Sequence, residues 1–303
     1  MAVTGRGTQD DPYIIHDYYE LRETFPKQAK NEQGEYMGNG NPCYIELVND
    51  INCNDYAVDF VWEGLYTPSG YYEEASHTYL NLKGHTIKNL SIQQGKLFAQ
   101  CNRGGITISN GRILNVFGAG AEGFCNVTKL ENLTLSINMT GQKTAANIIR
   151  STDIYRCSIY CICKTPTQAF LSANTVNLCD IYMDVNVTGV WMGTSNNSRR
   201  ISSRFRGFLY GNSTNGGKSW TQGDSIDCVY NLDFTHAPIA SGGAPQVAIG
   251  YYSNTSTGNA ENYELSRPAS HVSNVRVLFV DSAQMKDAGY LTDNGFFVFE
   301  ITE

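Results

Sequence analysis

The sequence predicts an all-β solenoid, a stack of short β-coils with small capping helices at both ends. The first observation is a six-residue pattern (apolar, any residue, Asn, apolar, any residue, apolar) that recurs along the chain. Full or looser copies begin at Ile87, Ile108, Leu130, Ile154, Val176, Val229 and Val272. The first five starts, at 87, 108, 130, 154 and 176, are 21, 22, 24 and 22 residues apart. A period in the twenties with one strand signal per repeat is typical of solenoids, and these repeats are too short for two helices.

The second observation is the composition, which is that of strands joined by tight turns. Helix formers are scarce in the middle of the 303 residues, where Asn, Gly, Thr, Ser, Tyr and Ile dominate. One elongated domain is expected, because a solenoid grows without needing a second core. We assign residues 1–78 to an N-terminal cap with the first strands and 79–280 to the solenoid, with loop insertions near 190–225. Residues 281–303 are assigned to a C-terminal capping helix and strand.

Capping segments are predicted at the two ends. Near the N-terminus, Pro12 to Ile15 is a short strand signal, and a helix is expected from Asp17, its N-cap, to Phe25. Near the C-terminus we expect a helix from Ser282 to Leu291 and an apolar strand at Phe296-Phe297-Val298-Phe299. Such caps would cover the open ends of a β-stack, which otherwise invite aggregation.

The recurring pattern also predicts how side chains stack. Ile87, Leu130, Val176 and Val229 are expected to form one interior column. The Asn of each repeat tolerates a left-handed turn, and its amide can hydrogen-bond the same position of the next coil. This structural interpretation is favoured over glycosylation for the N-x-S/T triplets, which begin at Asn126, Asn132, Asn138, Asn186, Asn212 and Asn254.

Charge and cysteine content narrow the function classes. A formal net charge of −7 argues against general nucleic-acid binding. The sequence contains neither an apolar run long enough to span a membrane nor an evident secretion signal at Met1, so we expect folding in a cytoplasm. The nine cysteines are then reduced thiols, many of them in strand-like runs. Cys157 and Cys179 are expected to stack in one core column.

No metal or other cofactor is expected. The spacing of Cys161-Ile162-Cys163 suits zinc poorly, and strand alternation places both thiols on one face without a nearby His.

Several segments resemble right-handed parallel β-helix surface proteins that include the GLUG-type adhesins. The segments that carry the resemblance are Gly7-Thr8 with 11–15, 44–51, 82–90 with Leu97-Phe98, and 284–288 with Gly295-Phe296. It implies a right-handed single-stranded parallel β-helix. The same architecture carries adhesins, phage tail spikes, head fibres and polysaccharide-cleaving enzymes. Because no secretion signal or anchor is found, the chain looks most like a bacteriophage virion protein, made in the host cytoplasm and released by lysis.

The leading functional hypothesis is therefore a non-enzymatic structural component on the outside of a virion, such as a head fibre, decoration protein or receptor-binding spike. Its expected partners are further copies of itself, other virion proteins and a host surface glycan. A glycan depolymerase on the same scaffold and a bacterial surface adhesin are the alternatives. The sequence does not identify the position on the particle or the host.

Catalysis on this fold would need carboxylates, or a carboxylate with Arg or Lys, at one groove. Asp180, Asp184, Asp227 and Asp233 lie in or beside predicted coils, and Arg204 and Arg206 lie in the coil between them. Chance proximity among 29 acidic residues is the favoured interpretation, since no stretch forms a catalytic motif.

Two further features are candidates for glycan or partner contact. One is the basic cluster Arg199, Arg200, Arg204 and Arg206, whose default interpretation is charge balance with nearby Asp residues. The other is the pair Trp191 and Trp220, which lie in polar insertions where aromatic side chains stack on sugars or pin their own loop.

A homotrimer about the long axis is also expected. The 19 Tyr and 13 Phe exceed what a narrow β-coil holds inside, so some must face outward. Closed symmetry would bury such faces without forming fibres. Three-fold symmetry itself follows only from the spikes and fibres that the chain resembles.

Overall fold

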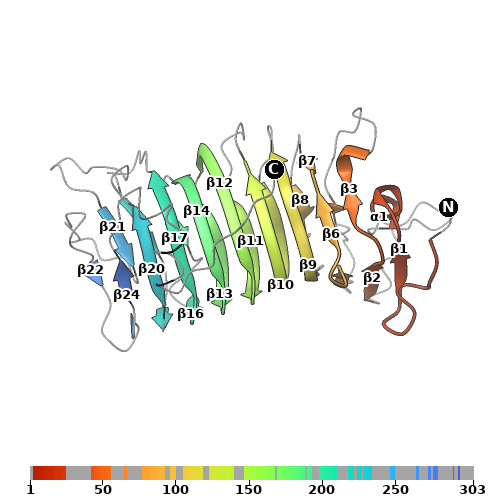
Figure 1. Ribbon diagram of the computed structural model, residues 1–303. Coiled ribbons are helices and arrows are strands. Elements are labelled where there is room, and N and C mark those ends of the chain that lie inside the picture. The colour runs from red at the N-terminus through yellow and green to blue at the C-terminus, as the bar shows by residue number, and fades with distance from the viewer. Residues whose placement is uncertain are drawn as a thin grey trace, which may run out of the picture.

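All pairings between the strands of the computed structural model are parallel, and they build one continuous ladder from β1 to β24 (Figure 1). The structure describes residues 3–24, 42–55, 65–66, 77–92, 96–99, 105–118, 123–139, 147–167, 169–187, 190–192, 198–210, 218–221, 224–226, 228–233, 246–249, 264–265, 272–273, 276–278, 289 and 293. The chain is therefore a parallel β-solenoid, as the repeat period predicts.

The strands form three faces, and each coil of the chain contributes to all three through the central part of the stack. Face 1 contains β1 (Tyr13–Ile15), β2 (Cys43–Leu47), β5 (His77–Asn81), β16 (Arg199–Ile201), β19 (Asp224–Ile226) and β23 (Val272–Ser273). Face 2 contains β3 (Ile51–Asn52), β6 (Thr86–Lys88), β7 (Ser91–Ile92), β12 (Ser158–Thr167), β14 (Asp180–Val187), β17 (Arg204–Tyr210), β20 (Val229–Asp233) and β24 (Arg276–Leu278). Face 3 contains β4 (Leu65–Tyr66), β8 (Lys96–Ala99), β15 (Val190–Met192), β18 (Lys218–Thr221), β21 (Gln246–Ile249) and β22 (Glu264–Leu265).

Four long strands bend from one face to the next. They are β9 (Gly105–Gly118), β10 (Gly123–Asn138), β11 (Asn147–Tyr155) and β13 (Ala169–Asn177). The start of β10 pairs with β8 on face 3, its middle with β11 on face 1 and its end with β12 on face 2. One strand thus passes around most of a coil.

The core is a set of interior columns in which a buried side chain contacts its equivalent in the next coil. On face 1 successive ladder partners are Leu80, Ile108, Leu130, Ile154 and Val176, which are at most 2% exposed. Burying each such side chain contributes roughly 1.5–3 kcal/mol. Repetition of this contact from coil to coil gives the stack a continuous apolar interior.

The prediction that Ile87, Leu130, Val176 and Val229 share one column is wrong. Leu130 and Val176 lie on face 1, whereas Ile87 pairs with Ile113 on face 2 and Val229 belongs to the face 2 strand β20. The three whose side chains are described, Ile87, Leu130 and Val176, still share one core cluster. The error arises because the six-residue pattern occurs at two different bends of the coil.

Both bends carry a ladder of Asn amides, which confirms the stacking expected for this residue. At the corner between faces 1 and 2, Asn132 Nδ2 donates to Asn110 Oδ1 at 3.0 Å, and Asn110 Nδ2 donates to Asn81 Oδ1 at 3.1 Å. At a bend within face 2, Asn115 donates to Asn89, which donates to Asn52. Asn89, Asn110, Asn115 and Asn132 have positive φ, between 51° and 62°, which Asn tolerates better than most residues.

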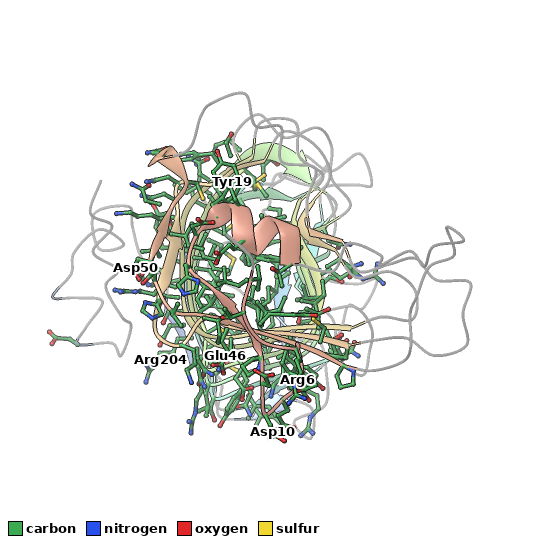
Figure 2. All side chains as sticks on the ribbon, turned by 90° about the vertical axis from the view of Figure 1, so that its right-hand side faces the viewer. Arg6, Asp10, Tyr19, Glu46, Asp50 and Arg204 are labelled. Atoms are coloured by element: carbon green, nitrogen blue, oxygen red, sulfur yellow. The ribbon has the colours of Figure 1, made fainter. Side chains whose placement is uncertain are left out.

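Helix α1 (Tyr18–Thr24) lies across the N-terminal end of the solenoid, as the view along the stack shows (Figure 2). Asp17 is its N-cap, because Asp17 Oδ1 accepts a hydrogen bond from the Glu20 backbone N–H at 2.9 Å. Tyr18 and Leu21 are buried against the first coils. An antiparallel bridge between Thr4 and Ile14 protects the edge of β1. The predicted helix with Asp17 as its N-cap is thus confirmed over Tyr18–Thr24.

The predicted C-terminal cap lies almost wholly outside the described residues. Gly289 and Asp293 have helical backbone, and the remainder of 282–299 is not described.

Candidate functional site on face 2

The four arginines of the predicted basic cluster do not form one surface. Ser202, with a φ of 46°, turns the chain from face 1 to face 2 and so separates Arg199 and Arg200 from Arg204 and Arg206. Arg199 is exposed, but Arg200 takes the interior position that follows Val176 in its column and is 1% exposed. Arg200 therefore cannot be a surface contact for a glycan.

Arg204 and Arg206 join two residues of β14 in a cluster on the outer surface of face 2. Strand register places Arg204 next to Asp180 and Arg206 next to Tyr182. Arg204 Nη1 lies 3.4 Å from Asp180 Oδ1. The Arg206 guanidinium carbon lies 5.2 Å from the centroid of the Tyr182 ring, within cation–π range. The next coil thus supplies a cation for each of these β14 side chains.

The preceding strand, β12, extends this cluster by two side chains. The Tyr160 ring stacks on Tyr182, with centroids 4.7 Å apart and an interplanar angle of 7°. The Lys164 ammonium forms an ion pair with Asp184. We call Tyr160, Lys164, Asp180, Tyr182, Asp184, Arg204 and Arg206 the face 2 cluster. It spans three consecutive coils.

Burial governs the electrostatics of the face 2 cluster. Burial raises the pKa of Asp180, and the charges of Arg204 and Arg206 lower it by less than burial raises it. Burial also lowers the pKa of Arg206, against the opposing effects of Tyr182, Asp180 and Tyr160. Burial, followed by the Asp184 charge, raises the pKa of Tyr160. Asp180 and Arg206 are 8% and 6% exposed, which is low for side chains on an outer face.

Two of the four predicted catalytic carboxylates are brought together with the arginines, namely Asp180 and Asp184. Asp233 is in β20, opposite Phe208, and its side chain is not described. Asp227 lies outside the described residues. Chemically, the described part of the cluster offers two ion-paired carboxylates, two phenols and three cations.

The two tryptophans do not lie in loops, which corrects the sequence-based expectation. Trp191 is in β15 and Trp220 is in β18, so both belong to the face 3 ladder. Trp220 pairs with Val190 and with Ala248, although the β15–β18 register contains an irregularity. Their polar flanks conceal the strands, because Gly, Asn and Ser next to a short strand look like an insertion.

The cysteines lie where strand alternation places them. Cys161 and Cys163 are both buried on the interior side of β12. Cys157 and Cys179 share a column, because the Cys157 backbone N–H points to Cys179 Sγ at 3.5 Å. Within the described ranges no group of three or more His, Cys, Asp or Glu side chains could hold a metal ion.

Sequence reasoning missed the aromatic stacks. Tyr160 and Tyr182 are 22 residues apart, the same step that separates Ile154 from Val176, and this shared period was the available signal. A second stack lies on face 1, where Tyr44 and Tyr79 have centroids 4.7 Å apart and His77 lies 4.4 Å from Tyr79. Residues at equal phase in neighbouring coils are in contact whether they are apolar or aromatic.

Comparisons with known proteins add little beyond the fold. No family model matches the chain, and no curated protein matches it. A solved structure from Bacteroides ovatus, provisionally named an immunoglobulin A1 protease, is similar over 99% of this chain and 95% of that chain, with 13% sequence identity and a TM-score of 0.44. Similarity at this level does not carry an activity over to this chain. Among the described helices, none has the length and apolar character that crossing a membrane requires.

Proposed function

We propose that this chain is a non-enzymatic structural component of a bacteriophage particle, exposed on the particle surface as a head fibre, decoration protein or receptor-binding spike. The observation that supports a non-enzymatic role is the ion pairing of the carboxylates in the face 2 cluster. Asp180 and Asp184 each contact a cation from an adjacent coil, Arg204 and Lys164. Carboxylates held in this way join coils to one another, which is a structural use of the chemistry.

The thiols support assembly in a reducing cytoplasm, where a particle of this kind is built. None of the eight described cysteines is in a disulfide, and six of them are buried. In reducing conditions such residues act as small core side chains, and the fold needs no disulfide. The assignment to a phage rests on the resemblance to β-helix spikes and fibres.

The test is to locate the protein on purified particles. We expect peptides of this chain in density-purified virions, and we expect antibodies against the folded protein to label intact particles. Its absence from washed particles that retain their major capsid protein would contradict the proposal.

A glycan depolymerase is the second candidate, and one observation favours it. Asp180 has a raised pKa and lies close to Arg206 and the stacked tyrosines, so it could serve as a general acid. This alternative predicts release of reducing ends from host polysaccharide by the purified protein, and loss of that release in Asp180→Asn. As a control, Asp10→Asn alters an exposed carboxylate in the N-terminal turn ahead of β1 and should retain activity.

Host glycans and other virion proteins remain proposed partners. Of the arginines considered as contacts, Arg199 is exposed and Arg204 has 42% of its side chain exposed, so these two can reach such a partner.

A further inference from the structure

One outer column of face 1 alternates in charge along the solenoid. Parallel register joins Lys129 to Asp153, Asp153 to Thr175, and Thr175 to Arg199. Arg199 in turn pairs with Asp224. From β10 to β19 the charges therefore run positive, negative, neutral, positive, negative. We call these five positions the charge column, and Thr175 is its centre.

The described members of the charge column face away from the core. They precede the interior residues Leu130, Ile154, Val176 and Arg200 by one position, so strand alternation turns them outward. Arg199 is exposed, and Lys129, Asp153 and Thr175 are partly exposed. Lys129 Nζ already contacts Glu131 Oε2 at 2.8 Å, with 36% of the Lys129 side chain exposed.

This charge order is self-complementary under one particular symmetry. Consider two copies packed face to face with their solenoid axes antiparallel. The two-fold axis that relates them lies in the interface, parallel to the strands, at the level of Thr175. A rung is here the position that one coil contributes to the column. Each rung then meets the rung at equal distance on the other side of the axis. Asp153 meets Arg199 of the second copy, Lys129 meets Asp224, and Thr175 meets itself. All four charged positions find the opposite charge.

The three central rungs of the neighbouring outer column fit the same axis, and its outermost rungs place Glu131, which is ion-paired with Lys129, opposite Ile226. Register joins Tyr155 to Asn177 and Asn177 to Ile201. In the antiparallel arrangement Tyr155 meets Ile201, giving an apolar contact between two partly exposed side chains, and Asn177 meets Asn177. An amide can donate to and accept from its own symmetry mate. The two residues on the axis, Thr175 and Asn177, are thus uncharged, and each can contact the same residue of the second copy, as an isologous interface requires.

A parallel two-fold arrangement through this face is disfavoured by the same residues. With its axis along the charge column, each rung would meet its own copy, and Lys129, Asp153 and Arg199 would each oppose an identical charge. Juxtaposed like charges are unfavourable at an interface.

We propose that the protein forms an antiparallel homodimer through face 1, with its two-fold axis at Thr175. This arrangement replaces the trimer expected from resemblance, and it does not depend on the phage assignment. The five rungs of the charge column extend about 19 Å, so the contact is small and rich in charge. We therefore expect a dissociation constant in the micromolar range that increases with salt concentration.

The first measurement is the mass of the purified full chain by sedimentation equilibrium, between about 1 and 100 µM at low and at high salt. We expect a shift towards twice the 33.5 kDa chain mass as concentration rises, and a weaker shift at high salt. A monomer at every concentration would overturn the proposal, and a trimer would overturn it in favour of three-fold symmetry.

A charge swap tests the geometry. Asp153→Arg places a cation opposite Arg199 of the partner, and Arg199→Asp places a carboxylate opposite Asp153, so each single variant should weaken the dimer at least tenfold. The double variant Asp153→Arg with Arg199→Asp restores opposite charges and should recover most of the affinity.

Arg112→Glu, a charge reversal at an exposed position of face 2, is the matched control and should dimerise normally. Circular dichroism confirms folding of each variant. Normal dimerisation of both single variants would contradict the antiparallel axis. Failure of the double variant to recover affinity would contradict it as well.

Discussion

The corner between faces 1 and 2 is built in two ways along the stack. In the earlier coils its left-handed residue is Asn110 or Asn132, and the Asn amides hydrogen-bond one another on the outside. In the later coils the left-handed residue is Arg156, Leu178 or Ser202, with φ between 46° and 55°, and none of these can continue the amide ladder. The same turn is therefore stabilised by different contacts.

In the later coils the hydrogen bonds move inside, to the residue that follows the left-handed one. The backbone N–H of Cys157 points to Cys179 Sγ at 3.5 Å, and the N–H of Cys179 donates to Ser203 Oγ at 3.1 Å. Cys179 Sγ and Ser203 Oγ in turn donate to the carbonyls two residues earlier, those of Asn177 and Ile201. Each coil thus supplies the acceptor for the corner N–H of the coil before it. A buried N–H needs such a partner.

The largest effect is expected where the earlier coils use an apolar residue at this inner position. Leu133 is 2% exposed, and in Leu133→Asp a carboxylate would replace it in the dry stack. An unpaired buried charge costs several kcal/mol, about 3–5 in comparable cases, so we expect the protein to unfold or to melt at much lower temperature. Thermal unfolding by circular dichroism measures this. Ser136→Asp, at an outward position of the same strand, should change the free energy of unfolding by less than about 1 kcal/mol. A Leu133→Asp variant that melts with the wild type would refute the interior placement.

The next largest effect should separate the two corner designs. Cys179→Ala removes the sulfur that accepts from the Cys157 N–H, leaving a buried donor unsatisfied at a cost of about 1–3 kcal/mol. Cys179→Ser keeps a small polar atom, as Ser203 does naturally one coil later, and should cost clearly less. Urea unfolding of both variants measures the difference. Equal losses would show that the thiol acts only by filling space.

Much of the fold could be predicted because its signals are local and repeated. Strand alternation and the period place most buried residues correctly, including the Cys157 and Cys179 column. The assignment of a repeat to a particular bend could not be predicted, because Asn89 and Asn110 have similar surroundings in sequence but lie at different bends. Contact between equivalent positions, rather than pattern alone, decides which residues share a column.

The candidate site was less predictable because it depends on which side of a strand each charge occupies. Arg200 would ordinarily be placed outside, yet it follows Val176 in the interior column and is 1% exposed. Four arginines close in sequence therefore appear as one cluster, although the turn at Ser202 divides them. The stacking of Tyr160 on Tyr182 can be predicted only when the coils are aligned in their true register.

A smaller effect of opposite sign is expected at Leu178. This residue has a φ of 55° and is 46% exposed, so it carries the cost of the left-handed conformation while burying little apolar surface. For an ordinary L-residue that cost is roughly 1–2 kcal/mol, and Asn avoids part of it. We expect Leu178→Asn to stabilise the protein by about 0.5–1 kcal/mol, measured by urea unfolding. Leu178→Val, which is β-branched, should destabilise it. A loss of stability in the Asn variant would show that Leu178 makes a contact worth more than its strain.

The smallest effect concerns Asp180, which follows Cys179 directly at the same corner. Burial raises the pKa of Asp180 in the folded protein, and the Arg204 charge opposes that rise. The folded state therefore holds this proton to higher pH than the unfolded chain, whose Asp pKa is about 3.9. The resulting stabilisation is fully present below the unfolded pKa and is lost as pH rises through the folded pKa. As pH rises above about 4, the free energy of unfolding of Asp180→Asn should rise relative to that of the wild type, because the amide has no proton to lose. Arg204→Gln removes an opposing charge and should move the wild-type transition to higher pH. A difference between Asp180→Asn and the wild type that stays constant with pH would show that Asp180 titrates alike in the folded and unfolded states, and that its ion pair with Arg204 fully offsets its burial.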